Sequence, residues 1–167
     1  MVRPENLREF NFEGPVNRRK FLKDYEELVK HIRDDGVEVL FMHELLKDDA
    51  DALAYMAKRP NMVYMRDLAT VLDGGAILWS MALIGRKWDN VVVQKALARL
   101  GVPILGEVKA PDLLEGGAFT FLSPRVVAAS LCTRATEGAF FYLADLLLGR
   151  HLDELVMVPT TRDIFHI

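Results

Sequence analysis

The sequence predicts an α/β fold, because one layout recurs three times along the chain. Each time, an amphipathic helical segment is followed by a glycine and then by a short apolar segment with the character of a strand. The glycines are Gly36, Gly101 and Gly149, and glycine readily adopts the left-handed conformation that commonly ends a helix. Helices that alternate with short strands favour an α/β architecture with small sheets and outer helices.

The helices are predicted from apolar residues that recur at helical spacing. Phe21, Tyr25 and Leu28 share one face of a helix expected over residues 16–35. Further helices are expected over residues 49–58, where Pro60 stops the helix, and over residues 88–100 and 136–148. The apolar segments after the three glycines are predicted strands, at residues 37–41, 102–105 and 154–158.

Short strands also precede the last two long helices. They are predicted at residues 62–66, 69–72 and 76–79 before one helix, and at residues 118–122 and 126–131 before the other. The order strand, strand, helix, strand therefore occurs about twice in full, with a partial unit at each end. Residues 73–75 and 109–112 are typical of turns rather than linkers, so we expect a single domain over residues 1–167.

Composition excludes several classes of protein. Apolar residues make up 51% of the chain and charged residues 27%, as in ordinary globular proteins. A net charge of −3 argues against nucleic-acid binding, and the basic triplet at residues 18–20 is typical of a solvated helical turn. The single Cys132 excludes an intrachain disulfide and fits a reducing compartment. We find no signal-peptide pattern and no apolar run long enough to span a membrane, so we expect a cytoplasmic protein.

Several polar residues in separate segments could form a site together. Carboxylates and arginine side chains pair through two parallel hydrogen bonds, which gives orientation as well as energy. Each residue has a plainer interpretation when taken alone: a local ion pair for Asp67, a turn for Gly116 and Gly117, and a surface position for a single arginine. The candidates are Asn61, Tyr64, Asp67, Arg86, Glu115, Gly117, Cys132, Arg134 and His166, and Asp67 closes the segment 61–67 directly after Arg66.

Taken in order, these residues resemble the arginine deiminase and amidinotransferase (pentein) superfamily of guanidine-modifying enzymes. The resemblance is strongest to the arginine deiminase branch. It implies a propeller of five ββαβ units around a central channel, of which this chain would supply roughly three. We expect the chain to be truncated at both ends, because the customary opening strand and the family's later nucleophilic Cys have no counterpart. The family's His-x-Asp motif also breaks off just after His166.

The resemblance also implies a role for each candidate. The catalytic residues would be Glu115, His166 and Asp67, with His166 as the general acid and base. Substrate would be bound by Asn61, Tyr64, Asp67, Arg86, Gly117 and Arg134, the two arginines holding its α-carboxylate. The family commonly has Asp where this chain has Ala118. Cys132 falls in the segment of Arg134, where the family carries no thiol, so we expect it to be a buried apolar residue.

The reaction implied is the hydrolysis of arginine to citrulline and ammonia, without a cofactor or a metal. Amidino transfer and the hydrolysis of a methylated arginine are alternatives within the same family. An alternative of another class is a non-catalytic module that binds arginine-like ligands or partner chains. We expect no nucleic-acid or membrane partner, but an oligomer or a complementing chain, because residues 126–131 and 155–158 would be apolar strands left unshielded.

Overall fold

The computed structural model describes residues 4–161, 164 and 166, and the chain forms two compact units. The first unit comprises Met1–Pro60 and the second Asn61–Ile167. Each unit is described by itself below. The expectation of a single domain over residues 1–167 stays a prediction.

The N-terminal unit is helical in its described residues. Its longest helix, α2, begins after Asn17, whose side chain accepts a hydrogen bond from the Lys20 N–H at 3.1 Å, and it ends before Gly36, which has a φ of +80°. The strand predicted at residues 37–41 is wrong. A strand requires a partner, and the described residues of this unit contain no other strand with which to pair. The elements are η1 (Pro4–Asn6), α1 (Leu7–Phe10), α2 (Arg18–Asp34), α3 (Met42–Leu45) and α4 (Ala50–Met56).

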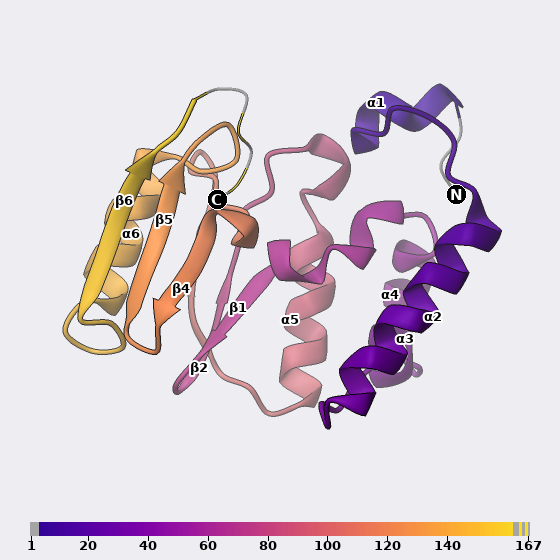
Figure 1. The fold of residues 1–167 in the computed structure, drawn as a ribbon, viewed down its shortest axis with the longest axis horizontal. Helices are drawn as coiled ribbons and strands as arrows, with labels where there is room; N and C mark the ends of the chain where they lie inside the picture. Colours follow the sequence, from indigo (N-terminus) through magenta and orange to yellow (C-terminus); the bar gives the residue numbers. More distant parts are fainter. Residues whose placement is uncertain (1–3, 162–163, 165, 167) are drawn as a thin grey trace. The chain divides into compact units, whose positions relative to one another are not determined.

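The C-terminal unit contains two three-stranded sheets with the same topology (Figure 1). In each sheet the first two strands are antiparallel, and the third returns parallel to the second after a helix. The first sheet has β1 (Ala69–Leu72), β2 (Gly75–Leu78), α5 (Asp89–Arg99) and β3 (Ile104–Glu107). The second has β4 (Phe119–Ser123), β5 (Val126–Leu131), α6 (Glu137–Leu147) and β6 (Glu154–Pro159). The prediction of two full ββαβ units is therefore confirmed.

Two expectations about strands are wrong. Residues 62–66 form no strand but lie in two 3₁₀ helices, η2 (Pro60–Val63) and η3 (Met65–Asp67). Residues 126–131 are not an unshielded edge, because they form β5, the central strand of the second sheet. Strand β6 does lie at an edge of that sheet, and Val156 on it is exposed. The apolar character of β5 thus reflects burial between two neighbouring strands.

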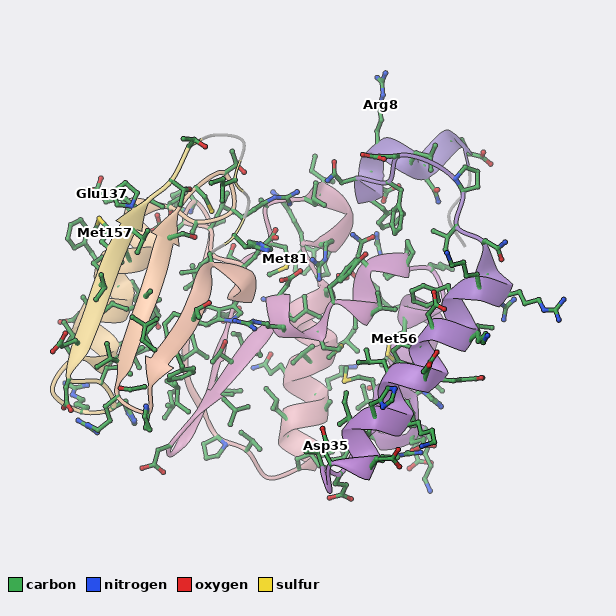
Figure 2. All side chains as sticks on the ribbon, viewed as in Figure 1. Arg8, Asp35, Met56, Met81, Glu137 and Met157 are labelled. Atoms are coloured by element: carbon green, nitrogen blue, oxygen red, sulfur yellow. The ribbon has the colours of Figure 1, made fainter. Side chains whose placement is uncertain are left out.

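Helix α6 covers one face of the second sheet and also contacts the first sheet. Ala139, Leu143 and Leu147 on α6 are fully buried, as is Val127 on β5 (Figure 2, where Glu137 marks the start of α6 and Met157 lies on β6). The hydroxyl of Tyr142 accepts a hydrogen bond from the Glu107 N–H at 3.1 Å. The same helix therefore ties β3 to the second ββαβ unit.

An aromatic pair connects the two sheets near their β1 and β4 strands. The rings of Trp79 and Phe119 lie 5.3 Å apart between centroids, and both residues are buried. The indole N–H of Trp79 donates to the Thr70 hydroxyl at 3.0 Å, which satisfies the polar atom of this large buried side chain.

None of the helices in the described part of the chain has the length and apolar character that a membrane span requires.

The first prediction concerns the start of α6. The hydroxyl of Thr136 accepts hydrogen bonds from the Ala139 and Leu113 N–H groups and donates one to Asp112. Thr136→Ala should therefore lower the free energy of unfolding by about 1–2 kcal/mol, measured by chemical denaturation. Thr136→Ser is the matched control, because it keeps the hydroxyl, and it should lie close to wild type. Equal losses in both variants would show that the methyl group of Thr136, not the cap, matters.

Candidate active site

An open hollow on the C-terminal unit brings together residues that are far apart in the sequence. It is lined by residues 63–67, which span the end of η2 and all of η3, by Gly117 on η5 (Gly116–Ala118) and by His166. Four of the predicted site residues, Tyr64, Asp67, Gly117 and His166, thus lie on one surface. The two 3₁₀ helices that replace the predicted strand 62–66 place Tyr64 and Asp67 there.

The guanidinium of Arg86 lies buried beside Asp67. Arg86 is only 2% exposed and donates to the carboxylate of Asp67 at 2.7 Å and to that of Asp89 at 3.3 Å. Its remaining Nη2 donates to the backbone oxygens of Asn61 at 3.4 Å and Tyr64 at 3.2 Å. The positive charge of Arg86 is therefore balanced by carboxylates of the protein, and its N–H groups donate to protein oxygens. The side chain thereby holds Asp67 in place at the hollow.

Asp89 is a residue of this arrangement that the sequence reasoning missed. It is fully buried at the start of α5, three residues after Arg86. Carboxylates are common in the first turn of a helix, so Asp89 alone gave no reason to select it. The signal that could have revealed it is the spacing Arg86-x-x-Asp89, which suits an ion pair across one turn.

Glu115 is at the centre of a second group of buried charged residues, beside the group formed by Arg86, Asp67 and Asp89. It is 2% exposed, and its Oε1 accepts hydrogen bonds from the Ala82 N–H at 3.0 Å and from Arg134 Nη1 at 3.2 Å. Its other oxygen, Oε2, lies 3.4 Å from Nε2 of His166. The carboxylate therefore joins Arg134, in the loop before α6, to the imidazole at the hollow.

The environment of Glu115 favours its ionised form. Burial by itself raises the pKa of this carboxyl, but the neighbouring His166, the Arg134 guanidinium and the Ala82 N–H together lower it more. The pKa of Glu115 therefore lies below its ordinary value of 4.5.

His166 packs directly on Gly117. A Cβ on Gly117 would overlap the imidazole ring, so only glycine leaves room for the ring in this position. The His166 side chain is 32% exposed, which leaves part of the ring open to the hollow. The imidazole is thus held between Glu115 and the backbone of Gly117 while remaining accessible to a ligand.

The neighbouring Gly116 packs against the backbone of Arg66. A Cβ at this position would collide with the backbone oxygen of Arg66 and approach the indole nitrogen of Trp79 to 2.9 Å. Without a side chain, Gly116 lets the backbone of η3 lie directly against η5. This approach brings Asp67 and Gly117 to the same hollow.

Four of the predicted residues do not line the hollow, namely Glu115, described above, and Arg86, Arg134 and Asn61. Arg86 and Arg134 are buried and paired with carboxylates, whereas both were expected to hold the α-carboxylate of a substrate. Asn61 is also buried, and its backbone oxygen accepts from Arg86. In this structure, these residues support Asp67 and Glu115 from inside the protein.

Cys132 and Ala118 also lie away from the lining of the hollow. Cys132 is half-buried, and its sulfur accepts a hydrogen bond from the Arg134 N–H at 3.4 Å. It is therefore less buried than expected. Ala118 is fully buried, and its N–H donates to the Glu115 backbone oxygen at 2.8 Å. An Asp at this position would have to bury a carboxylate.

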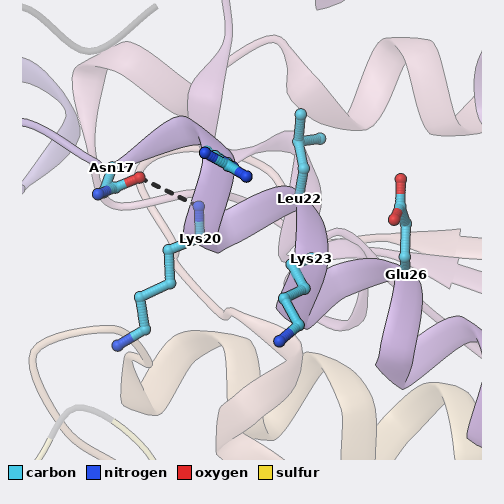
Figure 3. A pocket seen from close by; sticks show the side chains of 6 residues that line it. Asn17, Lys20, Leu22, Lys23 and Glu26 are labelled. Carbon is cyan, nitrogen blue, oxygen red and sulfur yellow. Dashed lines mark hydrogen bonds between the residues drawn. The ribbon is translucent and has the colours of Figure 1, made fainter.

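The described residues offer no other obvious chemical site. They contain no group of three or more His, Cys, Asp or Glu side chains that could hold a metal ion. A hollow on helix α2 of the N-terminal unit is lined by Asn17, Arg19, Lys20, Leu22, Lys23 and Glu26 (Figure 3). The hydrogen bond drawn between its lining residues is the helix cap, which the Lys20 N–H donates to the Asn17 side chain, so this surface is a solvated helix face.

Comparison with known proteins identifies the fold. No protein-family profile and no curated protein sequence matches the chain. Solved structures of dimethylarginine dimethylaminohydrolase do match it. The adduct with 4-chloro-2-hydroxymethylpyridine has a TM-score of 0.57 at 13% identity, over 74% of this chain and 54% of that chain. A mutant from Pseudomonas aeruginosa complexed with citrulline has a TM-score of 0.58 at 13% identity, over 79% and 58%.

A third match is a variant adduct with S-methyl-L-thiocitrulline, with a TM-score of 0.54 at 15% identity, over 76% of this chain and 56% of that chain. The chain has part of a pentein-type fold. It spans little more than half the length of the solved structures it matches. At such low identity the likeness establishes the α/β propeller architecture alone, and the arginine deiminase branch stays a prediction.

The second prediction concerns the ionisation of Glu115. Because its folded-state pKa lies below the ordinary 4.5, the charged carboxylate stabilises the fold fully above about pH 4.5. That stabilisation is lost as the pH falls through the folded-state pKa. Glu115→Gln should lower the free energy of unfolding at pH 7 by roughly 1–3 kcal/mol and flatten its decline in acid. The exposed Glu154→Gln is the control, and an unchanged acid slope in Glu115→Gln would contradict the assignment.

The third prediction concerns the contact between Gly117 and His166. Gly117→Ala should displace the imidazole, because the added methyl group occupies the position of the ring. The free energy of unfolding should change by only about 1 kcal/mol, since the ring is partly exposed. The measurement is the NMR signal of the His166 ring protons, which should move toward solvent-exposed values. Gly14→Ala is the control, because a Cβ there meets no atom within 4 Å, and identical His166 signals in both variants would refute the contact.

Proposed function

We propose that this chain carries the guanidine-recognising part of a pentein-type hydrolase that cleaves a guanidine C–N bond. The observation that carries the proposal is the hollow at which Asp67 and His166 meet, with the ionised Glu115 lying directly beneath the imidazole. Carboxylates bind a guanidinium through paired hydrogen bonds, and an imidazole can exchange protons near neutral pH. The low-identity likeness to dimethylarginine dimethylaminohydrolase supports the same class of chemistry.

In the proposed reaction, Asp67 binds the guanidinium and orients its central carbon. A thiolate forms a bond to that carbon, and His166 gives its proton to the departing nitrogen, whose C–N bond breaks. His166 then takes a proton from water, which adds to the same carbon and displaces the thiol. The products are citrulline and an amine, and no external oxidant or reductant is needed. Glu115, whose Oε2 lies 3.4 Å from Nε2 of His166, keeps the imidazole in place.

Arginine and methylated arginine are both proposed as substrates. The motif order from Asn61 through Arg86 favours arginine, whose departing group is ammonia. The three solved structures named above, which are of dimethylarginine dimethylaminohydrolase, favour methylated arginine, whose departing group is an alkylamine. The two reactions use the same recognition residues, so the identity of the released amine distinguishes them. Amidino transfer would instead place the guanidine carbon on a second amine.

A non-catalytic arginine-binding module is the candidate from another class. Cys132 is the only cysteine in the chain and does not belong to the lining of the hollow. We therefore propose that the attacking thiol comes from outside the described residues, from a complementing chain or oligomer partner. We also propose a cytoplasmic location, because a single cysteine, Cys132, which can form no disulfide within the chain, fits a reducing environment.

The fourth prediction tests ligand binding. The 167-residue chain should bind L-arginine weakly, and Asp67→Asn should reduce that affinity at least tenfold, measured by calorimetry. The reason is that removing one partner of a desolvated charge pair costs roughly 2–5 kcal/mol. Thermal unfolding of Asp67→Asn should accompany the titration, because Asp67 also pairs with Arg86.

Cys132→Ser is the matched control, and its affinity for L-arginine should equal that of wild type. Neither protein should release citrulline, because the thiol of Cys132 does not reach the hollow. Citrulline formation that disappears in Cys132→Ser would make Cys132 the nucleophile. Equal affinity of wild type and Asp67→Asn would remove Asp67 from the binding site.

A further inference from the structure

Asp89 is a buried charged residue that the proposed reaction does not use. It is fully buried at the first residue of α5, and its carboxylate accepts a hydrogen bond from Nε of Arg86 at 3.3 Å. It does not belong to the lining of the hollow, so it does not contact a ligand bound there. A carboxylate is costly to bury in a protein interior, so its presence here calls for a physical reason.

Hydrogen bonding alone does not require a second carboxylate beside Arg86. Nη1 of Arg86 donates to Asp67 at 2.7 Å, and Nη2 donates to the backbone oxygens of Asn61 and Tyr64. The Nε–H needs only an acceptor, and the amide oxygen of an asparagine is one. What a carboxylate adds at position 89 is therefore its charge.

That charge changes the electrostatic balance around Arg86. One guanidinium pairs with two carboxylates, so the three side chains together carry one net negative charge. Without the charge of Asp89 the sum would be zero, and a cation approaching Asp67 would also meet the uncompensated guanidinium of Arg86. Asp89 thus offsets the repulsion that Arg86 would exert on a cationic ligand.

Asp67 is the member of this group that reaches the hollow. Its side chain is 15% exposed, whereas those of Arg86 and Asp89 are 3% and 0% exposed. Arg86 donates to Oδ2 of Asp67, and within the described part of the chain Oδ1 accepts no hydrogen bond. The net negative charge of the group is therefore offered to a ligand through Asp67.

We propose that Asp89 is a positioning residue that compensates Arg86 and so keeps the charge of Asp67 available for a cationic ligand. This inference rests on the proposed function, in which Asp67 binds a guanidinium. The competing role of Asp89 is purely structural, because the first turn of a helix stabilises a carboxylate. A structural role would change the stability of the protein, but it would not distinguish a charged ligand from a neutral one.

The test compares two ligands that differ in charge at one end. L-Arginine has a guanidinium where L-citrulline has a neutral ureido group of nearly the same shape. Calorimetry on the 167-residue chain should show tighter binding of L-arginine by wild type. Asp89→Asn, which keeps the shape and an acceptor oxygen, should weaken L-arginine binding about tenfold and leave L-citrulline binding within about twofold of wild type.

Two further variants separate the charge of Asp89 from its place in the fold. Asp89→Glu keeps the charge and should retain the preference for L-arginine, even where thermal unfolding shows a loss of stability. Asp49→Asn is the matched control, since Asp49 is a carboxylate at the start of α4 in the N-terminal unit, where it caps the Ala52 N–H. Its preference should equal that of wild type.

A measurement on the wild-type protein tests the charge without any variant. The ¹³C NMR signal of the Asp89 carboxyl carbon should have the position of an ionised carboxylate at the pH of the titrations. A protonated Asp89 under those conditions would overturn the proposal, whether or not Asp89→Asn folds.

The outcomes distinguish this proposal from the function on which it rests. Equal weakening of both ligands in Asp89→Asn, or no weakening of L-arginine, would overturn the role of Asp89 and leave the proposed function standing. Loss of the preference for L-arginine in Asp89→Glu as well as in Asp89→Asn would also overturn it. If wild type does not bind L-arginine, the proposed function fails, and the role of Asp89 fails with it.

Discussion

The buried pairing of Arg86 with Asp67 and Asp89 is the interaction on which the candidate site depends. A single guanidinium connects the backbone of η2 and η3, the carboxylate at the hollow and the first turn of α5. Ion pairs inside proteins rarely add much stability over a well-packed apolar core, but removing one partner is costly. The network therefore fixes the position of Asp67 more than it stabilises the fold, and it explains why two short 3₁₀ helices keep a defined geometry.

Glu115 is likewise a buried carboxylate paired with an arginine, and it lies beneath His166. Burial of this carboxyl raises its pKa, but the neighbouring His166, the guanidinium of Arg134 and the Ala82 N–H together lower it more, so that the pKa lies below its ordinary value. In both groups of charged residues a buried arginine pairs with a carboxylate. Each arginine offsets part of the cost of burying the charge of its carboxylate partner.

Sequence reasoning predicted the periodic parts of the fold and missed what depends on tertiary contacts. Strands β1, β2, β4, β5 and β6 and helices α2, α5 and α6 were each predicted within one or two residues, because alternation and helical spacing are local signals. Residues 37–41 and 62–66 are equally apolar but form no strand, since strand formation requires a neighbour that local pattern does not reveal. For the site, the sequence identified the residue types, and the resemblance supplied their roles. The sequence pattern could not reveal that Arg86 and Arg134 pair with carboxylates inside the protein, because their partners Asp67 and Glu115 are distant in sequence.

The two adjacent glycines of η5 make the candidate site sensitive to a single added methyl group. Gly116 contacts the backbone of Arg66, and Gly117 contacts the ring of His166, so two sides of the hollow pack on one dipeptide. A Cβ at either position would lie far inside van der Waals distance of its neighbour. Segments that are distant in the sequence therefore meet at the hollow because this dipeptide has no side chains.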